Sequence, residues 1–163
     1  MFTNRISQKL HEEHRATMAV MERLEALLTS QRRAPPDGNK HAALLRDVAA
    51  SVESEVNRHF DFEERQLFTF LDTVGDAAIG AHLTAEHTAM RPLGARLAKL
   101  SRAAAAGGSD DASWTELRQV GLELCERMLT HVQKEEMALL PLIEESMDVE
   151  TEERLYEDYV ANA

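Results

Sequence analysis

A pattern of histidine and glutamate occurs twice in this chain of 163 residues, at almost the same spacing each time. In each copy a lone histidine is followed, about 45 residues later, by a second histidine with a glutamate four positions beyond it. The six residues are His14, His59, Glu63, His87, His131 and Glu135. Side chains four positions apart on an α-helix differ by roughly 40° in direction and about 6 Å along the axis. Each His-x-x-x-Glu pair can therefore present two ligands to one point, which predicts a two-metal site built on helices.

Apolar residues recur at steps of three and four along most of the chain, which is the pattern of amphipathic helices. Runs that contain turn-forming residues interrupt this pattern at residues 34–39, 72–75 and 107–111. The first expected long helix runs from a cap at residue 4 or 7 to about residue 33. The other three cover residues 40–71, 76–106 and about 114–145. A short acidic helix is expected at residues 149–160.

The sequence also offers signals for where the helices begin and where they bend. Asn4 or Ser7 can cap the first helix, and Ser113 with Glu116 three positions later forms a capping-box pattern that would open the fourth. A proline inside a helix removes one hydrogen bond and favours a kink. Two such prolines follow the predicted ligands, Pro92 and Pro141.

Four long helices joined by short loops alternate in direction, so the predicted fold is all-α: an antiparallel up-down-up-down four-helix bundle. A chain of 163 residues is one domain's worth and can bury a core without disulfides. An aromatic content of 5% argues further against a β-sandwich. We expect the bundle at residues 1–147 and a short acidic helix or tail at 148–163.

The net charge and the number of cysteines indicate which kinds of partner and which cellular compartment to expect. A formal net charge of −11 leaves no basic stripe to neutralise phosphates, so no nucleic-acid partner and no anionic membrane is expected. The single cysteine, Cys125, excludes an intramolecular disulfide and a thiolate cluster. Residues 1–14 lack an apolar run of signal-peptide length, and no segment has the roughly 18 uninterrupted apolar residues of a membrane span. We therefore expect a cytoplasmic protein; its oligomeric state is left open.

The two halves of the chain match beyond the histidines. An offset of 73 residues aligns the first helix with the third, and an offset of 72 aligns the second with the fourth. The matched positions include Glu13 with Glu86, His14 with His87, His59 with His131, Glu63 with Glu135, and Glu64 with Glu136. Such a repeat predicts a bundle with a pseudo-twofold axis, near which the matched residues converge.

Helical periodicity places all six residues on the apolar seam that faces the core. Around His59 the helical steps lead to Val52, Val56 and Leu67, and around His87 they lead to Leu83. Burying two carboxylates there without a positive charge would cost several kcal/mol each, and only Arg91 offers a cationic side chain near these stripes. Metal ions are the simplest counter-charge.

At these residues the chain resembles the hemerythrin-like, or HHE cation-binding, family, along nearly its whole length. The motifs are Glu-Glu-His at 12–14, His-Phe-Asp-Phe-Glu-Glu at 59–64, Glu-His at 86–87 and His-Val-Gln-Lys-Glu-Glu at 131–136. The resemblance implies a di-iron centre with an oxo or hydroxo bridge inside a four-helix bundle. It also implies terminal ligands at four histidines and bridging carboxylates at two glutamates, namely His14, His59, His87 and His131 with Glu63 and Glu135. Zinc or manganese suits the same ligands less well.

The chain departs from the oxygen-carrying members of that family in two places. They have a His-x-x-x-His pair on the third helix, and here Leu83 stands four positions before His87. They place an Asp five positions after the last-helix histidine, whereas here Glu135 is at the fourth position and Glu136 at the fifth. Each iron would then have an open position, which favours reactivity over simple carriage and predicts two similar irons.

The leading interpretation is thus a hemerythrin-like protein that binds, senses or reacts with dioxygen, nitric oxide or peroxide. Redox activity at a di-iron centre is open, and no separate catalytic residue is assigned. One alternative is iron storage or donation, connected with iron homeostasis or iron-sulfur repair. An alternative of another class is a metal-free helical interaction module.

Several neighbouring residues are interpreted as supporting or solvent-facing groups. His11 and His82 can offer a spare imidazole or a hydrogen bond, but a solvent-facing position is the simpler expectation. Glu13 and Glu86 are expected at the surface or beside a ligand, and Glu64, Glu136 and the acidic stretch 150–158 in solvent. Cys125 is not assigned as a ligand, and Phe60 and Phe62 are interpreted as packing residues.

Overall fold

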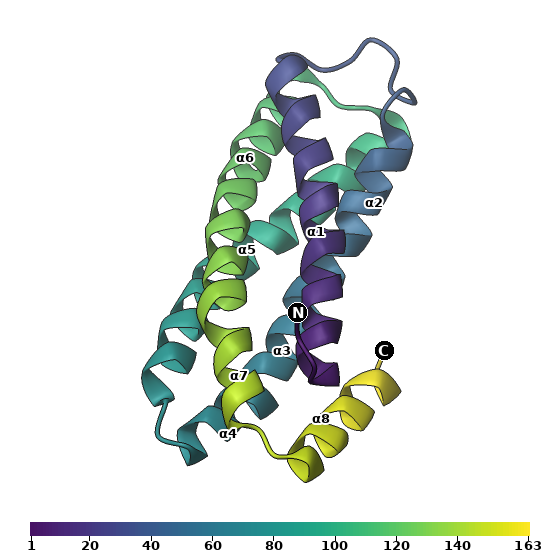
Figure 1. The fold of residues 1–163 in the computed structure, drawn as a ribbon. Coiled ribbons are helices and arrows are strands. Elements are labelled where there is room, and N and C mark those ends of the chain that lie inside the picture. Colours follow the sequence, from purple (N-terminus) through teal and green to yellow (C-terminus); the bar gives the residue numbers. More distant parts are fainter.

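The computed structural model describes residues 1–163 and contains helices but no strands, which confirms the all-α prediction. Four long helical rods run in alternating directions, and a fifth, shorter helix crosses one end of the bundle (Figure 1). The rods are α1 (Arg5–Ser30), the run from α2 (Ala42–Glu53) to α4 (Phe68–Thr73), α5 (Ala77–Gly107), and the run from α6 (Asp111–Lys134) to α7 (Leu140–Ser146). The short helix is α8 (Val149–Ala161). The predicted helix positions are therefore confirmed within a few residues.

The second and fourth rods contain π-helical turns at the positions of the predicted ligands. The second rod includes η1 (Ser54–His59), α3 (Phe60–Phe62) and η2 (Glu63–Leu67), and the fourth includes η3 (Glu135–Leu139). A π-helical turn adds a residue to the helical turn and occurs frequently at functional sites. His59 ends η1, while Glu63 and Glu135 begin η2 and η3. Pro141 lies in the first turn of α7, directly after η3, and Pro92 lies inside α5.

Of the two predicted helix caps, the one of the first helix is confirmed and the one of the fourth is not. Asn4 caps α1, because its side chain accepts hydrogen bonds from the backbone N–H groups of residues 6 and 7. Ser7 therefore lies inside that helix. The capping box predicted at Ser113 and Glu116 was wrong. Asp110 is the cap of α6, and it accepts a hydrogen bond of 2.7 Å from the Ser113 backbone N–H.

The apolar core is divided into two clusters, and the predicted ligands lie between them. One cluster has 21 buried residues, among them Met21 and Trp114, and the other has 12, among them Leu10 and Tyr159. On α1, for example, Leu10 belongs to the smaller cluster and Met21 to the larger, with His14 between them. The six predicted residues therefore form a polar layer across the bundle, covered by apolar residues on both sides.

Helix α8 packs on the bundle through an apolar face. Leu155 and Tyr159 are buried in the smaller cluster, while Glu150 faces solvent as expected. Glu152 departs from that expectation, because it is only 9% exposed and accepts a hydrogen bond of 2.8 Å from the Arg5 backbone N–H. This contact ties α8 to the start of α1.

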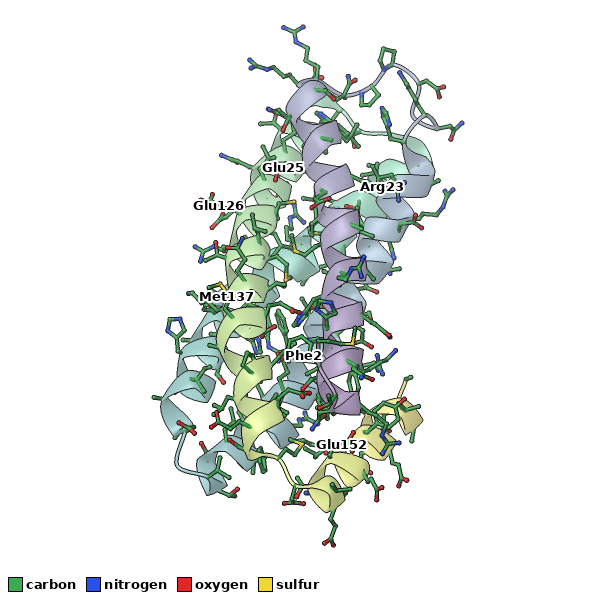
Figure 2. The ribbon with its side chains drawn as sticks, viewed as in Figure 1. Phe2, Arg23, Glu25, Glu126, Met137 and Glu152 are labelled. Carbon is green, nitrogen blue, oxygen red and sulfur yellow. The ribbon has the colours of Figure 1, made fainter.

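Charged side chains such as Arg23, Glu25 and Glu126 lie on the outer faces of the rods (Figure 2). None of the helices has both the length and the apolar character that crossing a membrane would require.

Candidate metal centre

The six residues of the duplicated pattern converge in the polar layer between the two apolar clusters. Each of the four rods contributes to it, and none of the six residues is more than 2% exposed. Two overlapping groups form, in each of which one ligand atom per residue lies within 4.8 Å of all the others. The first group is His14, His59, Glu63 and Glu135, and the second is Glu63, His87, His131 and Glu135.

The two glutamates belong to both groups because each one divides its oxygens between two histidine pairs. Glu63 places Oε1 3.2 Å from His59 Nε2 and Oε2 3.2 Å from His87 Nε2. Glu135 places Oε2 2.8 Å from His14 Nε2 and Oε1 2.7 Å from His131 Nε2. A carboxylate that spans two ligand groups in this way is arranged to bridge two ions.

Several buried atoms of these groups lie close to one another but form no well-directed hydrogen bond. They are His14 Nε2, Glu63 Oε2, and Oε1 and Oε2 of Glu135. The two Nε2 atoms of His87 and His131 also face one another at 3.0 Å. Buried nitrogen and oxygen lone pairs that converge on shared space are costly unless protons or metal ions lie between them. Imidazole and carboxylate ligands suit first-row transition metals, and the residues therefore fit a pair of such ions.

A second ring of carboxylates holds the outer nitrogen, Nδ1, of every one of these histidines. The contacts are Glu136 to His14 at 2.6 Å, Glu13 to His59 at 3.1 Å, Glu64 to His87 at 3.0 Å and Glu86 to His131 at 2.9 Å. A carboxylate at Nδ1 keeps the proton on that nitrogen and leaves Nε2 free for a metal. The expectation that Glu64 and Glu136 are merely solvated was wrong, because each bonds a histidine from another rod.

The ring follows the sequence repeat. Glu13 and Glu86 are matched positions, and each holds the histidine of the rod that follows its own helix. Glu64 and Glu136 are likewise matched, and they hold His87 and His14. The predicted pseudo-twofold relation therefore extends from the six central residues to the four outer carboxylates.

Cationic and hydroxyl groups hold the outer carboxylates in turn. Glu13 accepts hydrogen bonds from Arg58 at 3.0 Å and from the Tyr159 hydroxyl of α8. Arg91 bonds Glu64 at 3.1 Å, and Lys134 bonds Glu86. His11 Nδ1 lies 2.7 Å from Glu136.

Neither His11 nor His82 belongs to the two ligand groups. The side chain of His11 is 40% exposed, and that of His82 is 59% exposed and lies 3.5 Å from Glu86. Each therefore contacts an outer carboxylate rather than adding an imidazole to the centre.

These contacts shift the pKa values of the groups involved. Burial acts to lower the pKa of His14, but the carboxylates of Glu135 and Glu136, 2.8 and 2.6 Å from its ring nitrogens, outweigh it and raise that pKa to about 9. Burial acts to raise the pKa of Glu13, but hydrogen bonds from His59 and Tyr159 prevail and lower it to about 2. The metal-free centre is thus held together by imidazolium and carboxylate groups.

Glu55 is a further buried carboxylate at the centre, and the sequence analysis missed it. It is 3% exposed, and its Oε1 lies 3.9 Å from His59 Nε2 without a hydrogen-bond partner. Its Oε2 accepts a hydrogen bond of 3.0 Å from the Thr17 hydroxyl, and burial raises its pKa. Its position four residues before His59 was the available signal, because it shares the seam of His59 and Glu63.

A family model of the hemerythrin HHE cation-binding domain matches residues 5–100 and 79–159, which together span nearly the whole chain. The chain belongs to this family. No curated protein matched the sequence. The fold is accordingly a hemerythrin-like helical bundle, and its cluster of histidine and glutamate is capable of binding metal.

Within this HHE domain, Phe60 packs against the centre as predicted, while Leu83 and Cys125 belong to the apolar clusters. Leu83 is fully buried in the smaller apolar cluster, so no fifth imidazole stands at that place. Phe60 stacks on His87 with ring centroids 3.8 Å apart. Cys125 lies outside both groups in the larger cluster, where burial raises the pKa of its thiol to about 12.

Proposed function

We propose that this HHE domain holds two iron ions and uses them to bind or react with a small ligand such as dioxygen, nitric oxide or peroxide. The observation that carries the proposal is the division of the Glu63 and Glu135 oxygens between two histidine pairs. His14 and His59 would hold one ion, His87 and His131 the other, and the two glutamates would bridge them. Iron in such a centre supplies a redox couple.

The protein's own residues supply orientation and exclusion of water. The outer carboxylates fix the ring orientation of each histidine through Nδ1, and removing such a partner typically costs 10–100-fold in metal affinity. The two apolar clusters cover the polar layer from both ends of the bundle. A small ligand would therefore react in a layer that is shielded from solvent at both ends.

The number of imidazoles favours a reaction with the small ligand over simple carriage of that ligand. The centre has four histidines, and the place of a fifth is taken by the buried side chain of Leu83. Two imidazoles and two shared carboxylates leave an ion short of the six ligands of an octahedral site. Coordination positions would thus remain for an external ligand.

The test is to load the chelator-treated protein with ferrous iron under anaerobic conditions and to measure its metal content. We expect about two irons per chain, and optical spectra that change when nitric oxide, dioxygen or peroxide is added. Glu135→Ala should lose at least one iron, whereas the exposed Glu145→Ala on the same rod should keep both.

Three outcomes would contradict the proposal in different ways. A protein that folds with full helicity but binds no iron is a helical module without metal. Stable binding of zinc or manganese in preference to iron would move the site to another metal. Two irons that pass readily to a mild chelator, with no response to small ligands, would indicate iron storage or donation.

A further inference from the structure

The sequence repeat fails at one pair of positions beside the centre. Thr17 and Glu55 in the first half of the chain correspond, by the offsets of 73 and 72, to Met90 and Arg127 in the second. Every other carboxylate at the centre has a glutamate at its matched position. The two metal-binding groups therefore have different neighbours, contrary to the expectation of two similar irons.

Beside His14 and His59, Thr17 and Glu55 form a buried pair in which one carboxylate oxygen of Glu55 has no partner. Thr17 is 5% exposed, and its hydroxyl donates to Oε2 of Glu55, which holds that carboxylate in place. The other oxygen, Oε1, has no hydrogen-bond partner and lies 3.9 Å from His59 Nε2. Two ligand atoms about 2.1 Å from one octahedral ion lie roughly 3 to 4.2 Å apart, so this separation fits a shared ion. Neither group of mutually close ligand atoms includes Glu55, so a shared ion requires its Oε1 to lie closer to the other ligand atoms than it does without metal.

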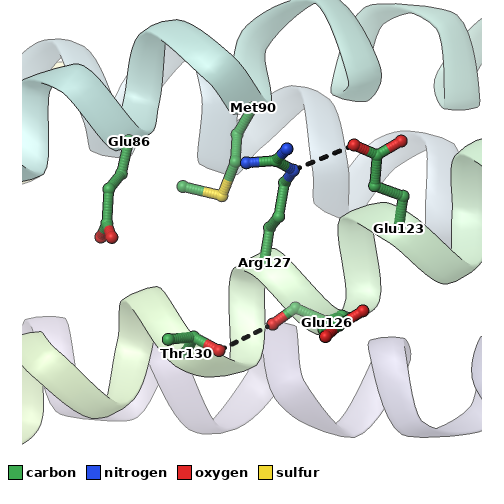
Figure 3. A pocket seen from close by; sticks show the side chains of 6 residues that line it. All are labelled: Glu86, Met90, Glu123, Glu126, Arg127 and Thr130. Atoms are coloured by element: carbon green, nitrogen blue, oxygen red, sulfur yellow. Dashed lines mark hydrogen bonds and ion pairs between the residues drawn. The ribbon is translucent and has the colours of Figure 1, made fainter.

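On the side of His87 and His131, the matched residues bring no carboxylate to the centre. Arg127 is exposed and bonds Glu123 on its own helix at 3.1 Å, while Met90 is 1% exposed. Together with Glu86 they line a pocket of about 400 Å³ between α5 and α6 (Figure 3). Glu86 lines this pocket and also contacts Nδ1 of His131, the ring nitrogen that faces away from the centre.

We propose that Glu55 is a fifth protein ligand of the ion held by His14 and His59, and that an external ligand binds the other ion. This inference rests on the proposed function. Glu55 would fill a position that stays open at the ion held by His87 and His131. The two irons are then inequivalent, and the small ligand binds the one held by His87 and His131, beside which Met90 and Arg127 replace Thr17 and Glu55.

The test compares the wild-type protein with Glu55→Leu, which removes both oxygens at similar volume. Glu25→Leu, an exposed position on α1, is the matched control. In the wild type and the control, ⁵⁷Fe Mössbauer spectra should show two distinct quadrupole doublets of equal area, and titration should bind one nitric oxide per chain. In Glu55→Leu the two doublets should converge, and the number of bound nitric oxide molecules should rise from one to two.

A reciprocal variant keeps the inference testable if Glu55→Leu fails to fold. The double substitution Met90→Thr with Arg127→Glu places the Thr17 and Glu55 pair on the other side, and it should reduce nitric oxide binding below one per chain. The inference is overturned if Glu55→Leu retains two irons with unchanged doublets and still binds one nitric oxide. It is also overturned if the wild type shows two equivalent irons. Wild-type protein that binds no iron would instead refute the proposed function.

Discussion

Without metal, the stability of this domain should fall as the pH rises from about 6.5 to about 9. His14 is the clearest contributor, because its two ring nitrogens lie 2.8 Å from Glu135 and 2.6 Å from Glu136. These carboxylates raise its pKa in the folded protein from 6.5 to about 9. A pKa that is higher in the folded state stabilises the protein fully below the unfolded value, and this contribution is lost as the pH rises through the folded value.

The size of the effect follows from the same numbers. Since each pKa unit corresponds to about 1.4 kcal/mol, the shift of His14 amounts to about 3 kcal/mol of unfolding free energy. The pKa of His87 is also raised to about 9, against the effect of its burial, by the nearby carboxylates of Glu135 and Glu63. The two histidines share Glu135, so their contributions do not simply add.

Bound metal should reverse the trend, because an imidazole must lose its Nε2 proton to become a ligand. The stability difference between loaded and metal-free protein should therefore widen between pH 6.5 and 9. Urea unfolding, followed by circular dichroism at pH 6.5, 7.5 and 8.5 with and without metal, measures both curves. Glu136→Gln should flatten the metal-free curve by removing one charged partner of His14. Metal-free stability that stays constant or rises over this interval would refute the reasoning.

Three further predictions concern single residues. Glu136→Gln should weaken metal binding about 10–100-fold in a competition titration, and an unchanged affinity would contradict the role of the Nδ1 contact. Gly94→Ala should lower the unfolding free energy by about 1–3 kcal/mol in urea, because the added Cβ would lie 2.7 Å from Cγ2 of Val56 and 3.1 Å from Cγ1 of Val52, both on stiff β-branched side chains. Tyr159→Phe should cost about 1 kcal/mol in the same assay and weaken metal binding slightly, because Glu13 loses one donor; identical behaviour to the wild type would show that α8 does not support the centre.

The helices and the six central residues were predictable because the signals are local. A helix repeats every 3.6 residues, so apolar spacing fixes which face is buried, and His59 with Glu63 share that face by spacing alone. The structure brings the six together, while their role as metal ligands stays a prediction. The fourth helix start was misjudged because Asp110 and Ser113 both suit a cap, and the choice between them depends on the preceding loop.

The sequence by itself determined a duplicated four-helix bundle with four imidazoles and two carboxylates on its inner seam. Tertiary structure alone decided which carboxylate meets which Nδ1, because that depends on the rotation and height of one rod against another. It also placed Tyr159 of α8 on Glu13, and it buried Glu55 beside His59 while leaving its counterpart Arg127 in solvent. Spacing along a chain fixes the direction of a side chain on its own helix, but not the neighbour that it meets across the core.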